Sequence, residues 1–217
     1  MPFFGFVPSE NLLNSIQDGI EKKNSNEPLY LLRDKTALLI NDEIIDAILT
    51  NVVHHFPVSD KRDTAEKLAG YIKSTVAVLL KQLLSKAPND VVRDSIAFSE
   101  RSLFKDTTGR YHVGEALDLS LVNNLKACFA DVMADKEVDR TALVEYYKQF
   151  ADATVRHFMV EFNKTLGLGM IKAKVADLGA VAVTKAVHIA INKLIPHLSH
   201  DELKALAEYH DGLFFVE

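Results

Sequence analysis

Two histidines three residues apart, followed at once by two acidic residues, form the first group in this chain that has the types and spacing of metal ligands. They lie in the stretch IPHLSHDE, where His197 and His200 precede Asp201 and Glu202. Imidazole and carboxylate groups are common ligands of zinc and iron. Ser199 followed three residues later by Glu202 is also the pattern of a helix capping box. The sequence therefore favours a turn between two helices, with His197 and His200 kept as candidate metal ligands.

A second candidate pair lies in VRHFMVEF, where His157 and Glu161 are four residues apart. On a helix this spacing brings the two side chains together, so they could share a metal or hydrogen-bond each other. They supply only two ligands, whereas a catalytic zinc ion needs three from the protein. We expect a simple pair on the flank of a helix, unless His188, His197 or His200 converges on it.

No other stretch of the sequence carries a complete catalytic or cofactor-binding pattern. Asp135, Glu137 and Asp139 alternate like the first ligands of a calcium loop, but Arg140 occupies the position of the obligatory turn glycine. Asp139 is better explained as the N-cap of the next helix. The phosphate loop, the dinucleotide-binding turn and the serine-hydrolase elbow are missing from the sequence. We therefore expect no cofactor, and the sequence favours a non-enzymatic protein without excluding an enzyme.

Composition predicts a folded protein with one domain over residues 1–217. Apolar residues make up 48% of the chain and the mean hydropathy is +0.03, which is enough to build a core. The net charge of −5 leaves no surplus of Lys and Arg, so nucleic-acid binding is not expected. The single cysteine excludes an intrachain disulfide. The first residues do not resemble a signal sequence, so we expect a cytoplasmic location.

Apolar residues recur every three or four positions along nearly the whole chain, which predicts helices. The segment NDEIIDAILTNVV fits a helix with Asn41 or Asp42 as its N-cap, whereas the segment 28–40 is ambiguous. Residues 103–113 break the period and predict a short hairpin or irregular loop. We expect an all-α, single-domain multi-helix bundle or orthogonal array with three long helices, at about 60–86, 139–166 and 169–195.

The predicted helix 169–195 is the most hydrophobic part of the chain. Five charged residues interrupt it, so it never reaches the length of uncharged sequence typical of a membrane span: Lys172, Lys174, Asp177, Lys185 and Lys193. We expect a polar stripe that includes His188 to face water. Its small residues and lysines also fit an amphipathic helix that lies on a membrane, which is a weaker alternative.

Bulky aromatic residues lie at both ends of the chain, where most chains are polar: Phe3, Phe4, Phe6, Phe214 and Phe215. They either dock onto the bundle, the commoner outcome, or anchor a protein partner or a second copy. Our first functional hypothesis is a non-enzymatic protein-interaction or regulatory module that uses these aromatics. The alternative is an enzyme or a small-ligand or metal-binding protein, with a site between helices that uses His157, Glu161 and further histidines.

Overall fold

Helices form most of the chain in the computed structural model, which describes residues 2–58 and 60–216. This confirms the mainly helical fold predicted from the period of apolar residues. The helical elements, in chain order, are α1 (Glu10–Lys22), α2 (Tyr30–Ile45), the π-helical segment η1 (Asp46–Thr50), α3 (Asn51–His54), α4 (Asp60–Leu83), α5 (Asn89–Arg101), α6 (Leu119–Met133), α7 (Arg140–Val155), the π-helical segment η2 (Arg156–Glu161), α8 (Phe162–Lys164), α9 (Met170–Leu194), the 3₁₀ turn η3 (Ile195–His197) and α10 (His200–Asp211).

Polar side chains fix the starts of several helices. Ser9, Asp118 and Asp139 accept hydrogen bonds from the first backbone amides of α1, α6 and α7. At α10, Ser199 Oγ accepts from the Glu202 amide at 3.2 Å, and Glu202 Oε2 accepts from the Ser199 amide at 2.7 Å. This confirms the capping box predicted in IPHLSHDE, which separates two helices.

The ambiguous segment 28–40 is helical, and the N-cap predicted at Asn41 or Asp42 was wrong. α2 begins at Tyr30 and continues through η1 and α3 to His54, so both residues lie inside it. Its N-cap position is held by Leu29, whose side chain cannot accept a hydrogen bond from the first amides. The usual polar signal of a helix start is therefore missing at this position.

Four short antiparallel strands form one sheet in the order β2-β3-β1-β4. β2 (Leu103–Lys105) and β3 (Tyr111–Ala116) are the hairpin predicted near 103–113, whereas β1 (Pro2–Phe6) and β4 (Phe214–Val216) were not foreseen. In the β1–β3 pair Gly5 lies opposite Gly114. A Cβ atom on Gly114 would lie 1.8 Å from the Phe4 carbonyl oxygen, so only glycine permits this close approach.

The aromatic residues at both ends of the chain belong to this sheet. Phe4, Phe6 and Phe214 are buried in the main core, with at most 4% of each side chain exposed. Phe3 and Phe215 are only partly buried. Docking within the chain is therefore the observed outcome for the three buried rings, and a partner that binds through Phe3 or Phe215 stays a prediction.

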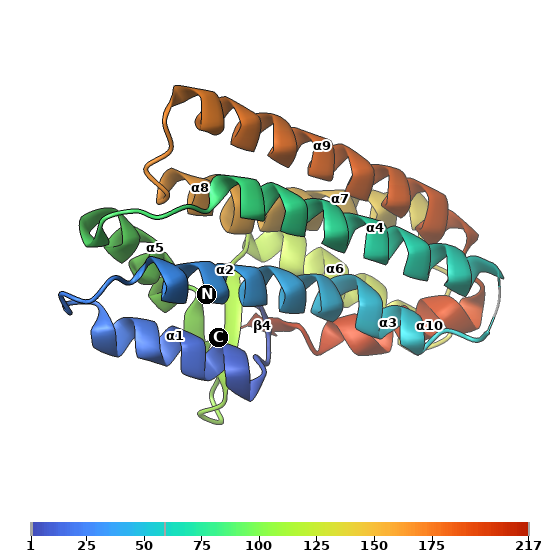
Figure 1. Cartoon of the computed structure of the whole chain (residues 1–217). Coiled ribbons are helices and arrows are strands. Elements are labelled where there is room, and N and C mark those ends of the chain that lie inside the picture. Colours follow the sequence, from blue (N-terminus) through green and yellow to red (C-terminus); the bar gives the residue numbers. More distant parts are fainter. Residues whose placement is uncertain (1, 59, 217) are drawn as a thin grey trace.

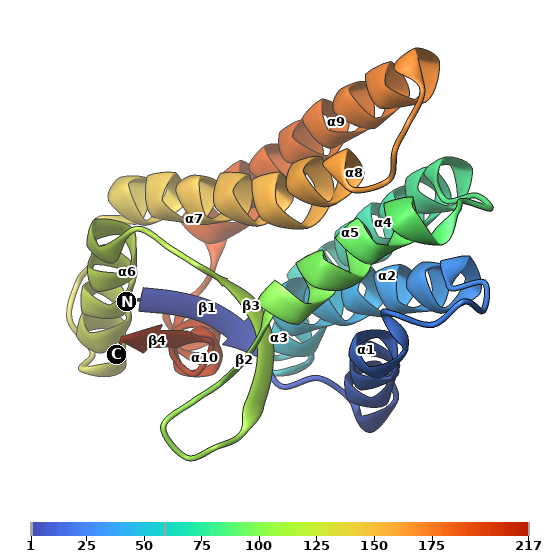
Figure 2. The ribbon, with the colours of Figure 1, turned by 90° about the vertical axis from the view of Figure 1, so that its left-hand side faces the viewer.

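The helices pack in layers around one main core. Figure 1 shows α9, α4, α2 and α1 following one another from one edge of the molecule to the other, with α6 and α7 behind them. In the turned view of Figure 2, α7 and α9 form one group and α2, α4 and α5 form another, with α6, α10 and the sheet toward the left. Side chains from helices of both groups line the candidate site.

Candidate functional site

An apolar cavity of about 160 Å³ lies between α2 and α4 on one side and α7 and α9 on the other, with α10 at one end. Its wall is almost wholly aliphatic and aromatic, as at Ile72 and Val76 of α4, Phe150 of α7, and Val183 and Ile191 of α9. None of its described lining residues is Lys, Arg, Asp or Glu. An apolar cavity of this size stays dry and accepts a benzene-sized hydrocarbon.

Alanines are the sequence feature that leaves this space open. Ala65 and Ala69 of α4, Ala151 of α7 and Ala190 of α9 all line the cavity. Protein interiors normally fill such space with larger side chains, because close packing stabilises the core. Small residues on three facing helices therefore create room that a bound molecule can occupy.

Both π-helical segments contribute to the same wall. Ile48 and Leu49 come from η1, and Phe158 and Met159 come from η2. A π turn inserts an extra residue into an α-helix and rotates the side chains that follow, and such turns occur frequently at functional sites. Two π-helical segments on one cavity wall therefore favour a functional site at this place.

A buried tyrosine and histidine form the polar part of the wall near α10. Tyr147 Oη lies 2.7 Å from His210 Nδ1, and His210 Nε2 lies 3.0 Å from the Ile48 carbonyl oxygen. Burial lowers the pKa of His210 to about 4, so its ring is neutral at pH 7. Nε2–H then donates to Ile48, and Nδ1 accepts from the tyrosine hydroxyl. Because the hydroxyl proton and the ring N–H are both used in these contacts, the pair has no hydrogen-bond donor left for a ligand.

Asn41 and Thr154 are the other polar residues of the wall, and a buried carboxyl lies behind Thr154. Seven residues separate Thr154 from Tyr147, so they share one face of α7 about 10 Å apart. Burial raises the pKa of Glu115 on β3 to about 8, an effect that Thr154 partly opposes, so this carboxyl is protonated at pH 7. Even so, Glu115 Oε1 and Thr154 Oγ1 have no hydrogen bond of normal geometry within the described residues. An uncharged polar group of a ligand could bond here.

His157 and Glu161 lie close together, as the sequence predicted, but beside the cavity. His157 Nδ1 is 3.3 Å from Glu161 Oε2, and His157 Nε2 is 2.9 Å from Ser102 Oγ. Burial lowers the pKa of His157 against the opposing effect of Glu161. The order serine, histidine, carboxylate is that of a hydrolase triad. Ser102 is fully buried, however, and donates to the Phe98 carbonyl at 3.0 Å, so it cannot attack an external substrate.

The structure does not bring the candidate metal ligands together. Among the described residues, no group of three or more His, Cys, Asp or Glu side chains could hold a metal ion. His200 lies 3.0 Å from Asp135 and His188 lies 2.8 Å from Asp152, in separate ion pairs. His197 is exposed at the end of η3. The convergence on His157 that a metal site required is therefore missing from the described part of the chain.

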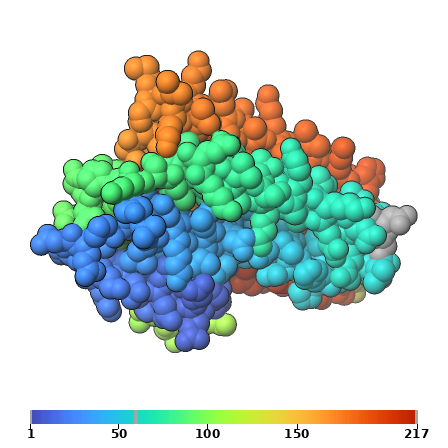
Figure 3. All heavy atoms as spheres, in the orientation of Figure 1, coloured from blue at the N-terminus to red at the C-terminus, as the bar shows by residue number. Residues whose placement is uncertain are grey.

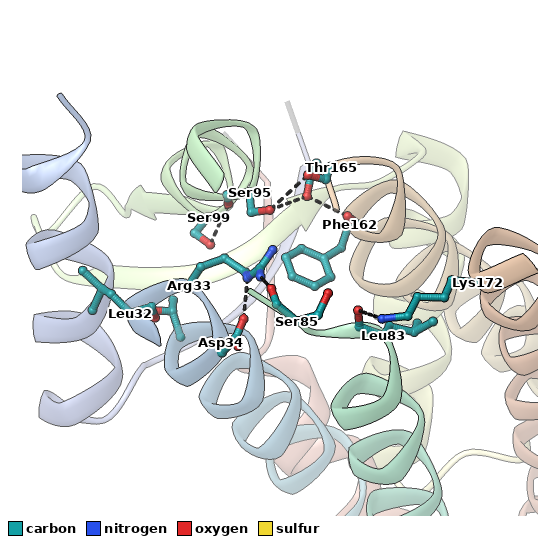
Figure 4. Close-up of polar contacts among 11 residues, drawn as sticks. Leu32, Arg33, Asp34, Leu83, Ser85, Ser95, Ser99, Phe162, Thr165 and Lys172 are labelled. Atoms are coloured by element: carbon teal, nitrogen blue, oxygen red, sulfur yellow. Dashed lines mark hydrogen bonds and ion pairs between the residues drawn. The ribbon is translucent and has the colours of Figure 1, made fainter. Parts of the chain in front are cut away.

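A separate polar cluster surrounds the buried guanidinium of Arg33 (Figure 4). Its Nε donates to Asp34 at 2.5 Å and its Nη2 donates to the Ser85 carbonyl at 2.7 Å. Nearby, the hydroxyls of Ser95 and Thr165 lie 2.8 Å apart. The space between these groups is about 10 Å³, enough for one water molecule. Arg33 thus connects α2 to the α4–α5 loop, and Ser95 connects α5 to Thr165, which follows α8.

Sequence reasoning looked for imidazoles and missed the cavity. The available signal was the small size of the residues at 65, 69, 151 and 190, which are all alanines on predicted helices. In comparisons with known proteins, no family model, curated protein or solved structure matched this chain. The functional proposal therefore rests on geometry and chemistry.

Proposed function

We propose that this protein binds a small apolar molecule, or the apolar chain of a larger one, in the cavity between α4, α7 and α9. One observation carries the proposal: a space of about 160 Å³ with a wall of aliphatic and aromatic side chains. The site differs from the one in the small-ligand alternative inferred from the sequence, because neither His157 nor Glu161 lines the cavity. The protein-interaction hypothesis stays a prediction, because the terminal aromatics that suggested it are largely used within the chain.

The wall also restricts the chemistry of the ligand. A charged group would lose its hydration in the cavity without gaining a partner of opposite charge, so the enclosed part must be uncharged. Tyr147 and His210 have no free donor, so they cannot bind a carbonyl oxygen, and hydrocarbon should lie against them. One hydroxyl or carbonyl group fits beside Thr154, where the protonated Glu115 lies behind the wall. A medium-chain alcohol has this combination of groups.

Thermal unfolding in the presence of octan-1-ol tests the proposal. A ligand that binds only the folded chain stabilises it by about 2.7 kcal/mol at a hundred times its Kd. Wild-type protein should therefore unfold at a higher temperature with the alcohol. Ala190→Leu fills the cavity from α9 and should abolish this shift.

The control for this experiment lies on the same helix. Ala180 is as buried as Ala190 but does not line the cavity. Ala180→Leu should lower the starting stability yet keep the response to octan-1-ol. An equal response of wild type and Ala190→Leu, or no response of either, would contradict ligand binding at this site. Native mass spectrometry would then show whether a small molecule stays bound to the purified protein.

A further inference from the structure

The outer face of α9 carries a row of large apolar side chains that the fold leaves uncovered. Figure 3 shows α9 as a ridge along one edge of the molecule. At 100° per residue, Ile171, Leu178 and Ile189 point within about 20° of one another. Each of the following side chains is between 39% and 90% exposed: Met170, Ile171, Val175, Leu178, Val181 and Ile189. This number of large apolar side chains exposed on one side of a helix indicates an interaction surface.

Positive charge is concentrated on the same helix. α9 carries four lysines and one acidic residue, Asp177, whereas the whole chain has a net charge of −5. Lys174 and Lys185 are exposed and lie within the arc of the apolar row. Their methylene chains can cover apolar surface while the ammonium groups extend to a neighbouring negative charge. The face therefore combines an apolar stripe with basic residues, as interfacial membrane helices do.

We propose that the outer face of α9 docks onto the surface of an anionic lipid bilayer, with the helix lying in the plane of the interface. The complementary charge of such a bilayer identifies it as the occupant. A second copy of the chain is disfavoured, because an antiparallel two-fold contact centred near residues 179 and 180 would place Lys174 of one copy against Lys185 of the other.

The helix lies on the bilayer rather than across it. Residues Met170–His197 are long and apolar enough to span a membrane, with a mean hydropathy of 1.4. Val183 and Ala190, however, are buried against the cavity, so spanning would expose the core. The inner face of α9 thus lines the cavity while its outer face contacts lipid. Docking needs no ligand, so this inference and the proposed function can fail separately.

Tryptophan fluorescence tests the docking directly, because the chain has no tryptophan. Leu178→Trp places a single reporter on the outer face of α9, and Leu31→Trp places a matched one on α2. The two leucines are similarly exposed, at 61% and 66%. Mixed with vesicles of phosphatidylcholine and phosphatidylglycerol in equal parts, Leu178→Trp should shift its emission to shorter wavelength, and Leu31→Trp should not. Vesicles of phosphatidylcholine alone should give a much smaller shift.

Charge reversal supplies the second arm of the test. The double variant Lys174→Glu, Lys185→Glu should weaken binding to the anionic vesicles at least about tenfold. Lys22→Glu, Lys35→Glu makes the same change in net charge on α1 and α2 and should have a much smaller effect. Both variants should keep the wild-type unfolding temperature.

Three outcomes would overturn the inference. The first is no emission shift of folded Leu178→Trp with anionic vesicles. The second is an equal shift of both reporters, which indicates unfolding at the lipid. The third is a shift of Leu178→Trp that follows protein concentration without vesicles, which assigns the face to a second copy. If the Ala190→Leu variant still binds anionic vesicles, this supports docking, whatever the result of the experiment with octan-1-ol.

Discussion

At the scale of single residues, the character of the cavity depends on a few polar groups that are satisfied internally. Tyr147 donates to His210, and His210 donates to the Ile48 carbonyl, so the hydroxyl proton and both ring nitrogens are paired within the protein. None of this was visible in the sequence, because the three residues come from distant segments. The sequence identified His157 and Glu161 as a pair because their contact is local, at helical spacing.

Removing the tyrosine hydroxyl should expose how much this arrangement stabilises the fold. Tyr147→Phe leaves His210 Nδ1 buried without a donor, which should lower the free energy of unfolding by about 1–3 kcal/mol. Denaturant unfolding measures the loss. Tyr209→Phe, at a partly exposed tyrosine on α10, should change stability much less. In a double-mutant cycle with His210→Leu, zero coupling would show that the hydrogen bond is not formed.

Because of Glu115, the free energy of unfolding should fall as the pH rises. Its pKa is raised from 4.5 to about 8 in the folded chain. The folded state therefore holds a proton that the unfolded state releases between these values. Its contribution is complete below pH 4.5 and is lost as the pH rises through 8. Glu115→Gln cannot titrate, so its free energy of unfolding relative to wild type should increase by a few kcal/mol across this window.

Denaturant unfolding of both proteins at several pH values checks this expectation. His210 acts in the opposite sense, because its pKa is lowered to about 4. It favours the folded state above pH 6.5 and loses this effect as the pH falls to 4. Since both proteins contain His210, its contribution cancels in the difference. A difference that stays constant with pH would mean that Glu115 is charged in the folded chain.

At the scale of elements, the sequence predicted what local chemistry determines. Ser199 and Asp139 marked helix starts correctly, because a cap needs only the adjacent backbone. The start of α2 has no such cap and was missed. The π-helical segments were missed as well, since their extra residue is defined by tertiary packing. On α9, a polar stripe was expected to face water, yet Leu178 and Ile189 are exposed as well.

A larger side chain on α4 tests whether the space between the helices is empty. Ala69 lines the cavity and Ala37 of α2 does not, although both are buried. Ala69→Leu should leave the free energy of unfolding unchanged or raise it, because the added carbons occupy empty space. Ala37→Leu should lower it by about 1–3 kcal/mol through overpacking. Equal losses in the two variants by denaturant unfolding would mean that no usable space exists at Ala69.

At the scale of the whole molecule, the site depends on helices that are distant in sequence. The cavity forms where α2, α4, α7, α9 and α10 meet, so no local motif encodes it. The sheet depends on tertiary structure in the same way, since β1 pairs with β3 and β4 from the middle and the end of the chain. The aromatic residues at both ends were recognisable in the sequence. The pairing of their strands was not, because the pairing of strands far apart in sequence is set by the whole fold.

We therefore expect β4 to contribute strongly to the free energy of unfolding. Phe214 is 3% exposed and packs on Phe4 and Phe150, with ring centroids 6.1 and 5.1 Å apart. Phe214→Ala should cost about 3–5 kcal/mol of unfolding free energy, because it opens a cavity in the core. Phe215→Ala, at the neighbouring and less buried ring, should cost clearly less. Denaturant unfolding measures both losses, and light scattering measures the mass in solution, which should stay unchanged. A change in mass with Phe215→Ala at little cost in stability would instead favour the partner contact predicted from the sequence.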